Sequence, residues 1–152
     1  MKNWFESKVT YLRTLDDGYV KRVTESYLMD AMSFTEAEAR TIEMIKPYVS
    51  GEGEIIIVAI KRCNISELFL SENCERFFKA KIQFIIEGEK GGKEKKVNEY
   101  MIIQADVIDE AQEIIKDKMK DTTSDYVIAE IKETQIVDVF LYNTGEDEES
   151  SN

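Results

Sequence analysis

An internal repeat constrains the fold of this chain more than any other feature. Residues 60–70 read IKRCNISELFL, and 71 positions later residues 131–141 read IKETQIVDVFL. Two further pairs of segments correspond: WFESKVTY (4–11) with FFKAKIQF (77–84), and KRVTE (21–25) with KKVNE (95–99). A repeated pattern of apolar and polar residues specifies a repeated structure. Two similar units are therefore expected.

Each copy begins with a period of two, which predicts a pair of strands with one buried face. On the first strand the inward residues are Phe5, Ser7, Val9 and Tyr11, matched by Phe78, Ala80, Ile82 and Phe84. On the second they are Val23, Tyr27, Met29 and Ala31, matched by Val97, Met101, Ile103 and Ala105. Asp17-Gly18 and Gly91-Gly92 lie between the strands and favour tight hairpins, because they tolerate a positive φ.

The period then changes to that of a helix. Thr35 and Glu38 have the spacing of a capping box, and Asp109 and Gln112 lie at the corresponding place in the second copy. The apolar stripes are expected at Ala39, Ile42 and Ile45, and at Ala111, Ile114, Ile115 and Met119. Two further strands follow each helix, so that each copy reads ββαββ.

The predicted fold class is α+β, with two tandem ββαββ repeats, antiparallel sheet or sheets, one helix per repeat and pseudo-two-fold symmetry. The first repeat is assigned to residues 1–71 and the second to 72–143, packed as one body with the two helices sharing a continuous sheet surface. A copy of about 70 residues buries too little surface to be very stable alone. Residues 144–152 are polar and acidic and are expected to be a disordered tail.

Composition excludes many kinds of chemistry. Histidine is absent, which removes the usual general base and the commonest transition-metal ligand. Cys63 and Cys74, the only cysteines, have no CxxC spacing and form no disulfide framework. Asp16-Asp17 lacks the other ligands of a calcium loop, and residues 87–96 lack the ending of a phosphate loop. We expect no catalytic residues, no cofactor and no metal, although an enzyme with paired carboxylates needs no histidine.

The net charge of −11 disfavours a nucleic-acid partner, because a phosphate backbone is repelled by the protein as a whole. A local basic strip is an open alternative, since all five arginines lie in the first half of the chain. It would use Arg13, Arg22, Arg40, Arg62 and Lys21, with Trp4 as a stacking ring. A third interpretation is an acidic mimic of nucleic acid.

The candidate interaction surface consists of residues that alternation turns away from the predicted core or that recur in both copies. One ring of each aromatic pair must point outward, which selects Trp4 and Phe77. The full set is Trp4, Lys8, Arg22, Lys61, Phe77, Lys81 and Lys132. The recurring lysines have a simpler explanation, because lysine protects a strand edge against pairing with a stranger. The rings could equally be covered by the other copy or by a second subunit.

WFESKV near the start, SFTEAEAR (33–40), DYVIAEIKET (125–134) and DVF (138–140) carry a family resemblance. With these motifs the chain resembles a family known only as a domain of unknown function, found mainly in Bacteroidetes and their bacteriophages. The resemblance spans nearly the whole chain up to about residue 142. It implies a small intracellular or phage-encoded α+β protein and carries no catalytic residues.

The leading prediction is a non-enzymatic protein-interaction or regulatory module with a protein partner or a homodimer. The longest apolar run, Ile55 to Ile60, is far shorter than the roughly 20 residues that span a bilayer. A soluble, cytoplasmic protein without a membrane partner is therefore expected.

Overall fold

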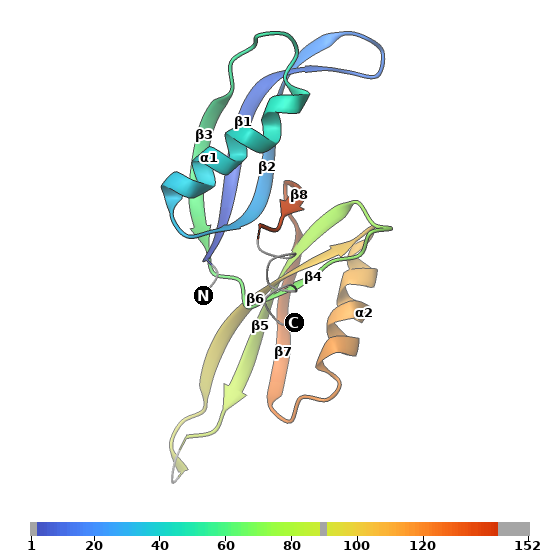
Figure 1. Cartoon of the computed structure of the whole chain (residues 1–152). Helices are drawn as coiled ribbons and strands as arrows, with labels where there is room; N and C mark the ends of the chain where they lie inside the picture. The colour runs from blue at the N-terminus through green and yellow to red at the C-terminus, as the bar shows by residue number, and fades with distance from the viewer. Residues whose placement is uncertain (1–2, 89–90, 143–152) are drawn as a thin grey trace, which may run out of the picture. The chain divides into compact units, whose positions relative to one another are not determined.

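The computed structural model describes residues 3–88 and 91–142 and has the predicted α+β class, with two four-stranded sheets and two α-helices. In chain order the elements are β1 (Asn3–Thr14), β2 (Val20–Ala31), α1 (Phe34–Ile45), the 3-10 helix η1 (Lys46–Tyr48), β3 (Ile56–Cys63), β4 (Glu67–Phe69), β5 (Arg76–Ile86), β6 (Lys95–Ala105), α2 (Ile108–Met119), β7 (Asp125–Glu133) and β8 (Ile136–Phe140) (Figure 1). The described residues contain no helix long and apolar enough to cross a membrane.

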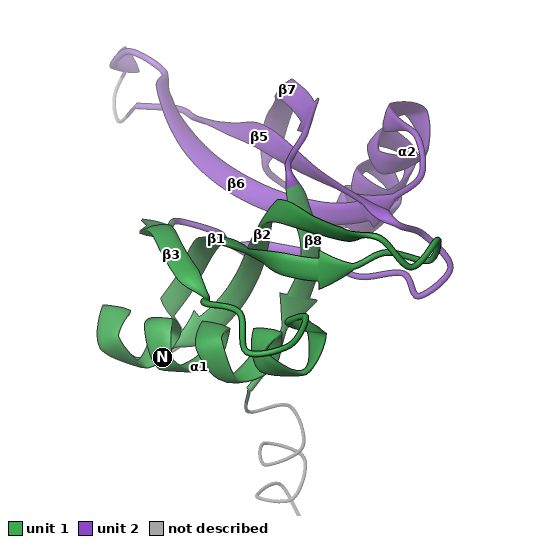
Figure 2. Cartoon of the chain, turned by 90° about the horizontal axis from the view of Figure 1, so that it is seen from above, with its two compact units in different colours: residues 1–63, 136–152 green, residues 64–135 purple. Residues whose placement is uncertain are grey.

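The two compact units do not coincide with the two sequence copies. Unit 1 comprises residues 1–63 and 136–152, and unit 2 comprises residues 64–135 (Figure 2). Strand orders are β3-β1-β2-β8 and β4-β6-β5-β7. Each copy therefore contributes its last strand to the sheet of the other copy, instead of completing the predicted 1–71 and 72–143 repeats. The expected continuous sheet is replaced by two sheets.

The connections explain this exchange. β8 pairs parallel with β2, and β4 pairs parallel with β6, whereas the other pairings are antiparallel. Since β3 is antiparallel to β1, it runs parallel to β2. A fourth strand placed parallel to β2 within its own copy would need a crossover of about a dozen residues or more. Only residues 64–66 separate β3 from β4, and only residues 134–135 separate β7 from β8.

Equivalent hydrogen bonds hold the chain just beyond each exchanged strand. The backbone N–H of Tyr142 donates to Asp30 Oδ1 over 2.8 Å, and the backbone N–H of Ser71 donates to Gln104 Oε1 over 3.0 Å. Asp30 and Gln104 occupy the same position of β2 and β6. In unit 1 the Arg40 guanidinium lies 3.3 Å from the centre of the Tyr142 ring, which adds a cation–π contact.

Helix α1 packs its buried residues Ala37, Thr41 and Ile45 onto β1 and β2. Ser33 is the N-cap, and its Oγ accepts a hydrogen bond from the Glu36 backbone N–H over 3.1 Å. The capping box predicted at Thr35 and Glu38 is therefore two residues too late. The predicted stripe is shifted as well, because Ala39 is exposed and Thr41 is buried. Thr41 is accommodated because its hydroxyl bonds to Ser7 Oγ and to the Ala37 carbonyl.

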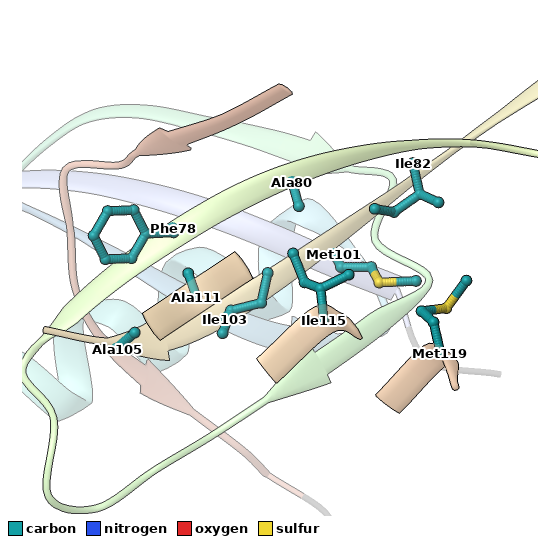
Figure 3. Packing of buried hydrophobic residues seen from close by; sticks show 9 residues of the cluster. All are labelled: Phe78, Ala80, Ile82, Met101, Ile103, Ala105, Ala111, Ile115 and Met119. Atoms are coloured by element: carbon teal, nitrogen blue, oxygen red, sulfur yellow. The ribbon is translucent and has the colours of Figure 1, made fainter. Parts of the chain in front are cut away.

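Helix α2 covers the equivalent face of the second sheet. Its residues Ala111, Ile115 and Met119 pack against inward residues of β5 and β6, namely Phe78, Ala80, Ile82, Met101, Ile103 and Ala105 (Figure 3). This stripe is as predicted. The capping box predicted at Asp109 and Gln112 is wrong. The N-cap residue is Val107, whose side chain makes no capping hydrogen bond, and the helix begins at Ile108.

The hairpin turns follow the predicted chemistry where they are described. Gly18 has φ 87°, a value that an L side chain rarely adopts, and Asp17 Oδ1 accepts from the Tyr19 N–H over 3.0 Å. Asp17 thus serves the turn. Gly91 has φ 78° and adjoins residues 89–90, which are outside the described part. The predicted acidic tail, 144–152, also lies outside it.

Phe140→Ala is expected to loosen unit 1 and not unit 2. The Phe140 ring stacks on Tyr27 with centroids 4.9 Å apart, so its loss should cost about 1–3 kcal/mol and weaken the pairing of β8 with β2. The rate of backbone amide hydrogen exchange should rise about tenfold to hundredfold at residues 26–29 of β2 and stay unchanged at residues 101–103 of β6.

The matched variant is Phe69→Ala in β4, which should show the reverse pattern. If Phe140→Ala instead speeds exchange at residues 101–103, the assignment of β8 to unit 1 is incorrect.

Candidate functional site

The predicted interaction residues are divided between the units. Trp4, Lys8, Arg22 and Lys61 lie in unit 1, and Phe77, Lys81 and Lys132 lie in unit 2. We use helix-free face for the face of each sheet opposite its helix. Alternation places Trp4 and Phe77 there, since Phe5 and Phe78 belong to the cores. Phe77 is only 2% exposed, so its ring is not at the surface as a stacking platform.

Edge protection accounts for only half of the recurring lysines. Lys61 and Lys132 lie on β3 and β7, which are edge strands. Lys8 and Lys81 lie on the inner strands β1 and β5, where no edge needs protection. Arg22 is exposed on β2, opposite Leu12.

Unit 2 brings two of the predicted residues together on its helix-free face. Lys81 and Lys132 line a hollow of about 250 Å³ with Lys79, Tyr100 and Glu130. Lys132 Nζ lies 3.8 Å from Glu130 Oε1, and Lys79 Nζ lies 5.0 Å from the centre of the Tyr100 ring. This group is called the lysine hollow below. Lys79 was not among the predicted residues, because its counterpart in the first copy is a glutamate, Glu6.

A second polar group, in unit 1, was not predicted. Glu25 Oε1 accepts from the hydroxyls of Tyr11, over 2.5 Å, and Tyr27, over 2.7 Å. Its Oε2 accepts from Arg13 Nη1 over 3.1 Å. Arg13, Glu25 and the hairpin residues Asp16 and Asp17 line a hollow of about 470 Å³. One carboxylate therefore satisfies two tyrosine hydroxyls and one guanidinium.

Comparison of the two copies gives the sequence signal for this group. Tyr11, Tyr27 and Arg13 correspond to Phe84, Met101 and Ile86, whereas Glu25 corresponds to Glu99. The carboxylate is common to both copies, and its donors occur only in the first. Three positions that are polar in the first copy and apolar in the second indicate a network. Taken one by one, Tyr11 and Tyr27 were predicted as inward strand residues and Arg13 as part of a basic strip.

The tyrosines of this network resist ionisation. Burial, with the hydrogen bond to Glu25 as the second cause, raises the pKa of Tyr11 to about 12. The same two causes raise the pKa of Tyr27. Both hydroxyls are therefore held as donors, because a tyrosinate beside the Glu25 carboxylate would add a like charge.

Three of the four arginines proposed for a nucleic-acid strip make contacts within unit 1. Arg13 is paired with Glu25, and Arg62 lies 5.5 Å from the Phe5 ring centre and 5.7 Å from that of Phe34. Arg40 bonds to the Asp30 carbonyl and to Glu36. Arg22 makes no ion pair within the described residues.

Fold and side chains together define an α+β protein of two similar units with exchanged end strands and different polar groups in each unit. The family model described as Domain of unknown function (DUF4494) matches residues 3–142, and the chain belongs to this family. No curated protein and no solved structure matches the chain.

Glu25→Gln is expected to lower the free energy of unfolding by about 1–3 kcal/mol at neutral pH, because hydrogen bonds to a charged acceptor become bonds to a neutral amide. Denaturant unfolding measures this loss. Glu99→Gln is the matched control and should cost less, because its neighbours Phe84 and Met101 carry no donor. Equal losses in the two variants would contradict the network.

Tyr11→Phe is expected to flatten the loss of stability at high pH. The pKa of Tyr11 is raised in the folded chain to about 12, from about 10 when unfolded. Its stabilisation is therefore complete below pH 10 and is lost as the pH rises through about 12. The unfolding free energy of the variant should fall less steeply between pH 10 and 12. A slope identical to that of the native chain would show that Tyr11 is not held in this way.

Proposed function

We propose that the protein is a non-enzymatic interaction module that binds an extended protein segment along the outer edge of β3. The observation that carries this proposal is an uncharged apolar run on an edge strand. Residues 56–60 read IIVAI, with Ile56 41% and Val58 51% exposed. No described strand pairs with the outer edge of β3.

An exposed edge of this kind favours a partner. Its row of unpaired backbone N–H and C=O groups is a template for another strand, and soluble proteins normally block it with charge. β7 holds the same position in unit 2 and is blocked in this way: four of its nine residues are charged, at Asp125, Glu130, Lys132 and Glu133. β3 has only Lys61 and Arg62, at its end.

A bulge in each edge strand limits the length of the docking segment. The register shifts between Lys8 and Val9, which leaves Val58 without a partner on β1, and between Lys81 and Ile82, which leaves Ala129 without one on β5. A bulge twists an edge and interrupts pairing. The expected occupant is therefore a short extended segment with apolar residues facing Ile56 and Val58, and an acidic side chain near Lys61 and Arg62.

The alternative of nucleic-acid binding through arginines has less support. Arg13 and Arg40 are paired with Glu25 and Glu36, and these ion pairs would have to be broken before the guanidinium groups reached a phosphate. A nucleic acid would have to compete with these carboxylates for the arginines, which disfavours nucleic-acid binding at this strip.

Ile56→Lys is expected to abolish partner binding while the fold is kept. A lysine at the first residue of β3 repels an apolar strand, and position 56 is exposed, so stability should change by less than about 0.5 kcal/mol. The measurement is the amount of partner retained by the tagged full chain from a lysate of the native host, with light scattering for self-association.

Val127→Lys is the matched control, because Val127 is the equivalent residue of β7 and is 48% exposed. It should retain the partner. Equal retention by the two variants would overturn the use of β3. Loss of a dimer in Ile56→Lys alone would identify a second copy of the chain as the occupant.

A further inference from the structure

We propose that the lysine hollow of unit 2 binds the phosphate group of a small anionic ligand. This inference rests on the side chains of Lys79, Lys81 and Lys132 and is independent of the docking edge on β3. It concerns one unit only, because the first copy has the same scaffold with different charges.

The strongest argument is an opposed pair of like charges. Lys79 and Lys132 are direct partners in the register of β5 and β7. Like charges directly opposite one another on antiparallel strands are destabilising. In unit 1 the same two positions hold Glu6 and Lys61, whose Oε1 and Nζ lie 3.9 Å apart. The first copy thus places opposite charges at this pair, whereas the second copy places two ammonium groups there, of which Lys132 has the carboxylate of Glu130 within 3.8 Å on its own strand.

The local charge is opposite to that of the chain. Lys79, Lys81 and Lys132 face one carboxylate, Glu130, which leaves a local charge of +2 in a protein of net charge −11. Glu130 is shared, because it lies 3.8 Å from Lys132 and opposite Lys81 in the register. A dianionic phosphate would match this excess, and its oxygens accept from ammonium donors in charge-assisted hydrogen bonds.

The scaffold positions two of the lysines before a ligand arrives. Lys79 and Lys81 alternate along β5 with Ala80 and Ile82, which are fully buried against α2 (Figure 3). The lysine backbones are therefore fixed by the core and by pairing on both sides of β5. Both lysines are half-buried, so their stems pack on the sheet while the ammonium groups reach the hollow.

The size of the hollow indicates the class of ligand. A volume of about 250 Å³ corresponds to about eight water molecules and is slightly below the range of sites for drug-sized molecules. It holds a phosphate with a small substituent. A nucleic acid would bring further phosphates against a protein of net charge −11, which disfavours a polymer.

The experiment is a titration of the full chain with inorganic phosphate and with pyrophosphate. Binding is measured by calorimetry and by the change of backbone amide chemical shifts in NMR spectra. Sodium chloride keeps the ionic strength constant. Saturable shifts are expected at residues 79–81, 100 and 130–132. Lys79→Glu should weaken pyrophosphate binding at least tenfold. It should fold as stably as the native chain or better, because it recreates the opposite-charge pair of unit 1.

Lys8→Glu is the matched control, since it makes the same change of charge on the helix-free face of unit 1. It should bind pyrophosphate within about twofold of the native chain. Equal weakening in the two variants, or equal shifts with sodium chloride alone, would overturn the site. Binding only of a single-stranded oligonucleotide, with no response to phosphate or pyrophosphate, would overturn the small-ligand assignment. If a variant fails to fold, the amide shifts of the native chain test the site: saturable shifts at residues 79–81, 100 and 130–132 support it, and their absence overturns it.

Discussion

The parallel pairing of β8 with β2, and of β4 with β6, is the constraint on which the rest of the structure depends. Neither sheet has its fourth strand without a segment from the other copy. Each exchanged strand is held by a hydrogen bond from the residue two positions beyond it, to Asp30 in one unit and to Gln104 in the other. The connections before these strands are too short for a crossover within one copy. Unit 1 therefore needs segments from both ends of the chain, whereas unit 2 is the continuous segment 64–135, which takes its strand β4 from the end of the first copy.

The two copies keep their scaffold and differ in the charges placed on it. Both have a helix packed on a hairpin, a bulge on the edge strand, and a lysine at positions 8 and 81. Around these constant features the polar groups diverge: Glu25 has two tyrosine donors, whereas Glu99 has apolar neighbours, and Lys79 stands where the first copy has Glu6. Differences between duplicated sites carry functional information, because packing requirements are the same in both.

Sequence patterns predicted the elements better than their boundaries. Most of the inward residues predicted on β1, β2, β5 and β6, and the stripe of α2, are confirmed as core residues, because burial of one face dictates a period that local sequence displays. Burial in β2 does not alternate throughout, because Ser26, Leu28 and Asp30 on the opposite face are buried as well. The start of α1 was placed at Thr35, although Ser33 with Glu36 fits the same capping pattern, and local chemistry did not separate the two. Thr41 was overlooked as a core residue, since its burial depends on a hydroxyl partner 34 positions away, Ser7.

The sequence by itself determined that the chain is a duplication of strand and helix units with inward faces of known composition. Those properties follow from periods of two and 3.6 residues, which are local. Only the tertiary structure decided which copy each last strand completes, that Phe77 is buried, and that Lys79, Lys81 and Lys132 share one hollow. These outcomes depend on strand order and register. Residues on neighbouring strands meet through pairing across long separations in the chain, and the apolar pattern of a last strand does not by itself specify which sheet edge it joins.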